Sequence, residues 1–247
     1  MIKLARLFTP IKLTPDFVKA KTEEYIRTGS SVWRIDWLKD SLKALSHNKC
    51  AYCECPLSKE SNYMEVEHFE DKCKYPEKVM AWDNLLPSCK HCNGSKSTHD
   101  VIAEPIINPF KDDPRDHLYF RLYRYKPKDE KGRQSIRVLK LNDPEREMVD
   151  TRFKIGNELE VLIDDVKAKY DRYKSCPSVG NRNDMTTPLF KMLRECQPDS
   201  EYSALCATVM HSNVIYQKLK VDLKADGIWD DEMEMMDAVS RELCMLA

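Results

Sequence analysis

Two Cys-x-x-Cys pairs place the strongest constraint on how this chain can fold. The first pair joins Cys50 to Cys53, and the second joins Cys89 to Cys92. Four thiolates in two closely spaced pairs match the tetrahedral ligand set that structural zinc prefers. The sequence therefore predicts a four-cysteine zinc site at these positions. Two neighbouring side chains are alternatives that could replace one of the ligands: Cys55 and His91.

The rest of the sequence favours a reduced, cytoplasmic setting for these cysteines. The chain has 247 residues, of which 42% are hydrophobic and 33% charged, as in a globular protein rather than a disordered one. Its first residues lack the apolar core of a secretory signal, and no run approaches the roughly 18 apolar residues that span a membrane. We therefore expect no membrane contact and metal binding rather than disulfides. Free cysteines, or a redox role for Cys50 and Cys53, remain as alternatives.

A second set of polar side chains lies between and just after the two pairs. It consists of Glu67, His68, Asn84, Asn93 and Lys96. A neutral imidazole can take a proton from water, and carboxylate or amide oxygens suit a hard cation such as Mg²⁺. The amide of Asn84 can brace a loop through backbone hydrogen bonds. Lys96 lies one helical turn after Asn93 and could bind a flanking phosphate as a point charge.

Together, these residues resemble the HNH endonuclease motif in its zinc-braced form. The resemblance implies a ββα-metal fold in which His68 is the general base and Asn84 orients it. Glu67 stands where many members have aspartate, and Asn93 stands where some have the final histidine. Both would hold a catalytic Mg²⁺ or Mn²⁺, and Lys96 completes the expected catalytic set.

A wider resemblance links the chain to the HNH proteins of Septu-type anti-phage systems, the PtuB group, which also occur beside retrons. It rests on the N-terminal helices, the central motif, the segment 106–110 and the overall length. It implies an effector nuclease that acts with an ATPase of the PtuA type, and in some systems with a retron reverse transcriptase and its RNA–DNA hybrid. DNA is favoured over RNA as the substrate. The alternative is a zinc-stabilised nucleic-acid-binding or adaptor module without catalysis.

The patterning predicts an α+β, predominantly helical protein with a central ββα-metal module. A cap at Thr14 and a stop at Gly29 bound the first helix, and a second is expected over about 32–46. A strand is expected over 64–69, and helices over about 142–174, 186–196, 200–222 and 230–245. We divide the chain into four regions: an N-terminal helical region (1–47), an HNH nuclease module (48–100), an irregular segment with a basic β-hairpin (101–141) and a C-terminal helical region for partner docking (142–247).

The expected hairpin pairs residues 118–125 with 135–141 across a polar turn. Residues 121–140 carry eight Lys or Arg against two acids, and aromatic residues lie among the first arginines. Cations beside stacking rings are typical of surfaces that bind nucleic acid. The predicted contacts are Arg121, Arg124, Lys126, Arg133 and Arg137. The alternative is a solvated hairpin with a half-buried aromatic face.

Overall fold

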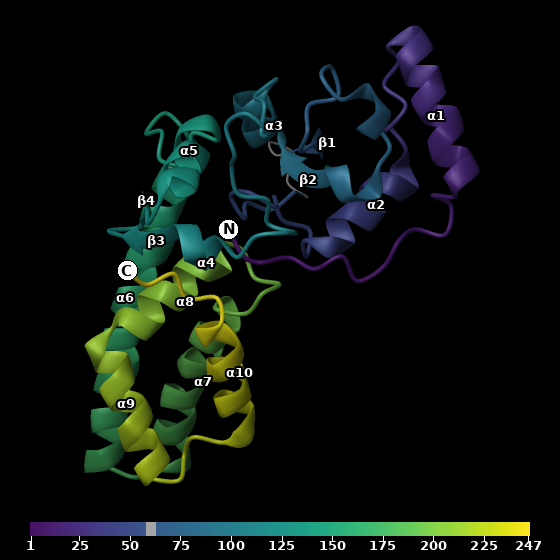
Figure 1. The fold of residues 1–247 in the computed structure, drawn as a ribbon. Helices are drawn as coiled ribbons and strands as arrows, with labels where there is room; N and C mark the ends of the chain where they lie inside the picture. The colour runs from purple at the N-terminus through teal and green to yellow at the C-terminus, as the bar shows by residue number, and fades with distance from the viewer. Residues whose placement is uncertain (58–62) are drawn as a thin grey trace. The chain divides into compact units, whose positions relative to one another are not determined.

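The computed structural model describes residues 1–57 and 63–247, so part of the predicted nuclease module, residues 58–62, lies outside the described residues. The chain separates into two compact units. The first contains residues 1–118 and 126–142, and the second contains 119–125 and 143–247. Within the described ranges the protein is mainly helical, with two small two-stranded antiparallel sheets (Figure 1). The predicted fold class, α+β and predominantly helical, is confirmed at this level.

The first unit begins with two helices at the predicted places. Helix α1 spans Pro15–Thr28; the Thr14 hydroxyl accepts a hydrogen bond from the Phe17 amide, and Gly29 ends the helix with φ of 68°. Helix α2 spans Asp36–Leu45, so it begins four residues later than predicted. Its buried leucines pack in a core that also includes residues of the following sheet: Val66 and Leu85.

That sheet is an antiparallel pair followed directly by a short helix. Strand β1 spans Met64–His68, close to the prediction, and strand β2 spans Leu85–Cys89. Two single 3₁₀ turns, η1 (Pro76–Lys78) and η2 (Trp82–Asn84), lie in the connection. Helix α3 spans Lys90–Lys96, and α2 and α3 both pack against the two strands. Because side chains alternate along a strand, β1 presents Val66 to the core under α2 and Glu67 toward α3.

The basic hairpin is shorter than the sequence suggested, and its predicted returning strand is wrong. After helix α4 (Pro114–His117), strand β3 (Leu118–Arg121) returns at once as β4 (Arg124–Pro127). The two linking residues both have positive φ, 49° and 59°, as a tight two-residue hairpin turn requires.

Residues 135–138 of the expected returning strand instead belong to helix α5, Glu130–Val138, and residues 139–141 follow its end without forming a strand. The polar run that suggested a turn contains the start of this helix, because the Asp129 carboxylate accepts a hydrogen bond from the Gly132 amide and caps it. Gly132 serves close packing, since a Cβ there would lie 2.1 Å from the His117 carbonyl oxygen.

The second unit is helical apart from the hairpin residues that it includes. The long helix expected over 142–174 is present as α6, Glu147–Ser175, which begins five residues later than predicted. The helix expected over 186–196 is α7, Val179–Glu195, which begins seven residues earlier than predicted. The helix expected over 200–222 is two helices, α8 (Ser203–Ser212) and α9 (Val214–Ala225). They are separate because extended Asn213 ends one helix and its side chain caps the next. Helix α10 spans Asp231–Arg241.

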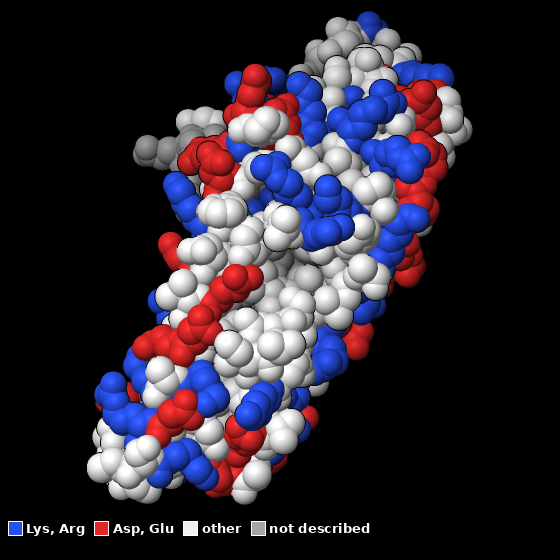
Figure 2. All heavy atoms as spheres, turned by 90° about the vertical axis from the view of Figure 1, so that its left-hand side faces the viewer, with Lys and Arg blue, Asp and Glu red and all other residues white. Residues whose placement is uncertain are grey.

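The surface charges of the chain are mixed. Figure 2 shows lysines, arginines, aspartates and glutamates interspersed over the visible face. Within the described ranges, no helix is both long enough and apolar enough to cross a membrane.

A buried polar network joins helices α8, α9 and α10. The Tyr216 hydroxyl and the Lys220 ammonium donate to the two oxygens of Asp237. The ring of His211 packs edge-on against Tyr216, and its Nε2 lies 2.8 Å from the Ser240 hydroxyl. Burial lowers the pKa of His211 to about 4, despite the attraction of Asp237. His211 is therefore neutral at neutral pH. At acidic pH the folded unit can protonate it only by burying a positive charge.

We expect the stability of the second unit to fall as pH is lowered from about 6.5 toward 4. In this window the unfolded chain binds a proton at His211 that the folded unit excludes, which costs on the order of 3 kcal/mol. Urea unfolding followed by circular dichroism should show this loss, and His211→Gln should remove most of it. The same substitution at exposed His91 serves as the control. If His211→Gln showed the same pH dependence as the wild type, protonation of His211 would not be the cause of the loss.

Candidate functional site

The four predicted cysteines come together in the first unit. The sulfurs of Cys50, Cys53, Cys89 and Cys92 all lie within 4.8 Å of one another, and all four residues are buried. The Cys53 and Cys89 sulfurs are 3.8 Å apart. Four sulfurs at about 2.3 Å from a zinc ion define a tetrahedron with edges of about 3.8 Å. The cluster could therefore hold a structural metal such as zinc.

The two alternative ligands stay outside this group of four. His91 is exposed on α3. Cys55 is buried beside the group, where its thiol interacts with those of Cys50, Cys53 and Cys89 and its carbonyl accepts a hydrogen bond from the Cys50 amide at 2.8 Å. The cluster therefore connects the turn after α2 to the junction of β2 and α3, where Cys89 also caps α3 by accepting from the Cys92 amide.

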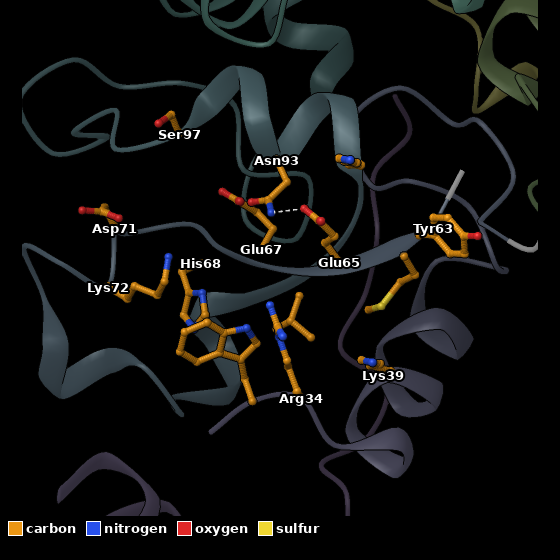
Figure 3. A pocket seen from close by; sticks show the side chains of 14 residues that line it. Arg34, Lys39, Tyr63, Glu65, Glu67, His68, Asp71, Lys72, Asn93 and Ser97 are labelled. Carbon is orange, nitrogen blue, oxygen red and sulfur yellow. Dashed lines mark hydrogen bonds between the residues drawn. The ribbon is translucent and has the colours of Figure 1, made fainter. Parts of the chain in front are cut away.

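A pocket of about 500 Å³ opens on the same module (Figure 3). Its walls come from residues 33–39, from β1 and the loop after it, and from α3. Three of the predicted catalytic side chains line it: Glu67, His68 and Asn93. Asn84 and Lys96 are buried and do not line it.

His68 is held firmly at the end of β1. Its Nε2 lies 3.0 Å from the Val79 carbonyl oxygen, and its ring packs edge-on against Trp33 with centroids 4.7 Å apart. Because a carbonyl oxygen accepts, Nε2 carries the proton and Nδ1 carries the lone pair. Burial, followed by the nearby charge of Lys72, lowers the pKa of His68 to about 3. The imidazole is therefore neutral at neutral pH, which is the form that can accept a proton.

Asn84 braces the loop that supplies this carbonyl. Its Nδ2 donates to the carbonyls of Glu70, at 3.1 Å, and Lys78, at 3.2 Å, and its Oδ1 accepts from the Glu70 amide at 2.7 Å. Lys78 directly precedes Val79, so Asn84 fixes the turn that holds the His68 ring. This geometry suits the orienting role that the family resemblance implied for Asn84.

Glu67 and Lys96 form a buried ion pair, 2.7 Å apart and each 2% exposed. The Lys96 ammonium also donates to the His68 carbonyl at 2.8 Å. Burial raises the pKa of Glu67 to about 7, although Lys96 opposes the rise. Lys96 was expected to reach a phosphate of the substrate. Its ammonium is instead buried against β1, where it contacts the Glu67 carboxylate and the His68 carbonyl. This buried geometry does not favour the direct phosphate contact that was expected of Lys96, and that contact stays a prediction.

Lys96→Met should destabilise the first unit, by up to about 3–5 kcal/mol at pH 8, because it leaves the Glu67 carboxylate buried without its cation. The loss should shrink at pH 6, where Glu67 takes up a proton and becomes neutral. Three of the four tryptophans lie in this unit, so urea unfolding followed by tryptophan fluorescence reports on it. The double variant Lys96→Met/Glu67→Gln should recover most of the lost stability. If it recovers none, the buried Lys96–Glu67 ion pair is not the cause of the loss.

Several residues that line the pocket were not predicted from the sequence. Glu65 lines the pocket and accepts a hydrogen bond from the Asn93 side chain. Its position two residues before Glu67 on a strand, hence on the same face, was the signal that could have found it. Other missed wall residues come from separate segments, and no local pattern marks them: Trp33, Arg34, Lys39, Lys72 and Lys90.

The five basic residues predicted to contact nucleic acid do not lie on one hairpin and do not line this pocket. Arg121 and Arg124 belong to the second unit, while the other three belong to the first. Arg133 and Arg137 lie on α5, where they pair with Glu130 at 2.6 Å and Glu104 at 3.2 Å.

Three aromatic residues of the hairpin pack against other rings. Phe120 stacks on Tyr125 with centroids 4.3 Å apart, and Tyr123 packs edge-on against Phe153 at 5.5 Å. The five basic residues therefore do not share the single hairpin that was expected, and their contact with nucleic acid stays a prediction. The alternative, a solvated hairpin with a partly buried aromatic face, describes the hairpin better.

Comparison with known proteins gives two significant relatives with the same name. The chain is 40% identical over 238 residues to "Septu protein PtuB" of Bacillus thuringiensis, which covers 96% of this chain and 92% of the relative. It is 31% identical over 160 residues to "Septu protein PtuB" of Bacillus mycoides (strain KBAB4), which covers 50% of this chain and 52% of that relative. No protein-family model matches the chain.

Proposed function

The chain belongs to the Septu PtuB family, and on that premise we propose that it is the effector nuclease of an anti-phage defence complex. Its reaction would be the metal-dependent hydrolysis of phosphodiester bonds by an HNH endonuclease, with DNA favoured over RNA as the substrate. The PtuB relatives support the defence role, and the geometry of the pocket supports the chemistry.

One observation carries the proposal. A single pocket brings together a neutral imidazole with its lone pair on Nδ1 and the oxygen-bearing side chains Glu67 and Asn93. They lie on an antiparallel strand pair followed by a helix, the order that an HNH module requires. The cysteine cluster joins that helix to the chain before the strands, so a bound zinc would fix the position of Asn93.

The donor set fits a hard divalent cation, because carboxylate and amide oxygens are the ligands that Mg²⁺ and Mn²⁺ prefer. Glu67 and Asn93 would hold the cation, which would stabilise the charge that develops on the phosphate. His68 would take a proton from the attacking water at Nδ1, while Val79 and Trp33 keep its ring in place.

The rim of the pocket suits a polyanionic substrate. Arg34, Lys39, Lys72 and Lys90 all line it. Among the described residues, none of these four forms an ion pair, whereas Lys74 and Lys78 in the adjoining loop do. The carboxylates of Glu65, Glu67 and Asp71 line the same pocket. Cations that form no ion pair and lie beside a water-activating imidazole can position phosphates on both sides of a scissile bond. They are better candidates for substrate contact than the predicted arginines of α5.

The partner assignments remain proposals that follow from the family. An ATPase of the PtuA type is the expected partner, and a retron reverse transcriptase with its RNA–DNA hybrid would join in systems that contain one. We expect the partner to license cleavage. Strong, unregulated cleavage by the isolated chain would count against that licensing.

The test is a cleavage assay on plasmid DNA and on RNA, with the purified chain alone and with its PtuA-type partner. We expect EDTA to stop cleavage and Mg²⁺ or Mn²⁺ to restore it. If neither substrate is cut under any of these conditions, the alternative of a non-catalytic nucleic-acid-binding or adaptor module gains the stronger claim.

A further inference from the structure

Glu65 and Asn93 meet across the junction of strand and helix. Glu65 lies on β1 opposite Ser88, one residue before the cysteine that ends β2. Asn93 lies in the first turn of α3, directly after Cys92 of the metal-binding cluster. Both are partly buried and line the pocket, and the Asn93 Nδ2 donates a hydrogen bond to Glu65 Oε2 (Figure 3).

This hydrogen bond decides which end of the Asn93 amide is available. An ionised carboxylate can only accept, so it selects the NH₂ group of the amide. The reverse orientation would place Asn93 Oδ1 against a carboxylate oxygen, where two acceptors repel. The side chain is therefore held with its oxygen turned away from Glu65, and the oxygen is the amide atom that a hard cation can bind.

We infer that Glu65 is a positioning residue that orients the Asn93 oxygen for the catalytic cation. The inference rests on the proposed function for the identity of that cation. Carboxylates that hydrogen-bond to a metal ligand commonly fix its orientation, and their removal typically weakens metal binding about 10- to 100-fold. Glu67, whose carboxylate is paired with Lys96, does not contact Asn93 in this way.

The inference is tested by Mn²⁺ binding to the zinc-loaded full chain, measured by electron paramagnetic resonance without any substrate. Glu65→Leu should weaken Mn²⁺ binding about 10- to 100-fold, as Asn93→Ala should. Glu65→Gln should keep most of the affinity, because its amide oxygen can still accept from Asn93. Circular dichroism and zinc content check that each variant is folded.

A double-mutant cycle separates orientation from direct ligation. Asn93→Asp replaces the amide with a carboxylate whose two oxygens are equivalent, so there is nothing left to orient. Adding Glu65→Leu to Asn93→Asp should then cost no further Mn²⁺ affinity, whereas a Glu65 that bound the cation itself would cost the same in both backgrounds.

Four results would overturn the inference: wild-type affinity in Glu65→Leu, equal losses in Glu65→Gln and Glu65→Leu, the same loss from Glu65→Leu in the Asn93→Asp background as in the wild type, or no Mn²⁺ binding by the wild-type chain that depends on Asn93. The proposed function fails separately. If the wild-type chain binds Mn²⁺ with the expected pattern but cuts no nucleic acid, Glu65 keeps its positioning role and the nuclease assignment is lost.

Discussion

His68→Ala is expected to abolish cation-dependent cleavage while the chain stays folded and keeps its zinc. Loss of a general base typically lowers the rate about 10²- to 10⁴-fold. His68 is the pocket histidine whose proton position is set by the structure, because the Val79 carbonyl holds Nε2 and leaves Nδ1 to accept a proton. The measurement is the single-turnover rate of plasmid or RNA cleavage at saturating Mg²⁺, with the proposed PtuA-type ATPase present.

His91→Ala is the matched control for this experiment. His91 belongs to the same module but is exposed on α3 and lies outside the pocket. It should cleave at the wild-type rate with unchanged zinc content. Full activity in His68→Ala would remove the basis of the proposed mechanism, whereas equal losses in both variants would indicate general damage to the module.

Local signals predicted those parts of the fold whose causes are local. Thr14 and Gly29 mark the ends of α1 because a hydroxyl cap and a left-handed glycine act within one turn of the helix. The same kind of signal was missed at Asp129, since the polar residues after it resemble a turn and Gly132 disfavours a helix. The packing that requires Gly132, against the carbonyl of His117, is a contact that no local pattern reveals.

In the candidate site, too, the features with local causes could be predicted and those that depend on packing could not. The four cysteines and the Glu67–His68 pair could be predicted because ligand spacing and adjacency are written in the sequence. The one-turn spacing of Asn93 and Lys96 was correct, yet it could not show that Lys96 turns inward to Glu67. The wall formed by Trp33 depends on how α1 and α2 fold back toward β1, which the sequence alone does not specify.

We expect the cysteine cluster to hold α3 and the pocket in place, and this expectation can be tested directly. Cys89 is held by three sets of contacts: it ends β2, caps α3 and contributes one sulfur to the cluster. Asn93 follows it by four residues, so these contacts also limit the position of Asn93. Orientation of the Asn93 amide by Glu65 requires that α3 hold its place against β1. Loss of the metal should therefore disturb the pocket even though the cysteines do not line it.

Cys89→Ser is expected to lose zinc and to destabilise the first unit more than a substitution of Glu65, His68 or Asn93 in the pocket. Structural zinc contributes about 10–16 kcal/mol of apparent binding free energy in small zinc-binding peptides, and a cluster with three sulfurs forfeits much of that. Zinc content by elemental analysis should fall well below one ion per chain, and tryptophan fluorescence should show unfolding at lower urea concentration. Cleavage should fall with the zinc content.

Cys73→Ser and Cys55→Ser complete the experiment. Cys73 is exposed in the loop after β1, so its substitution should leave zinc content and stability unchanged. Cys55 is buried beside the cluster but outside the group of four, so Cys55→Ser should keep the zinc and lose at most some packing stability. If Cys55→Ser lost zinc and Cys89→Ser kept it, Cys55 would be the zinc ligand in place of Cys89. Full zinc content in all three variants would mean that the cluster does not bind the ion, and that packing alone holds Asn93 beside Glu65.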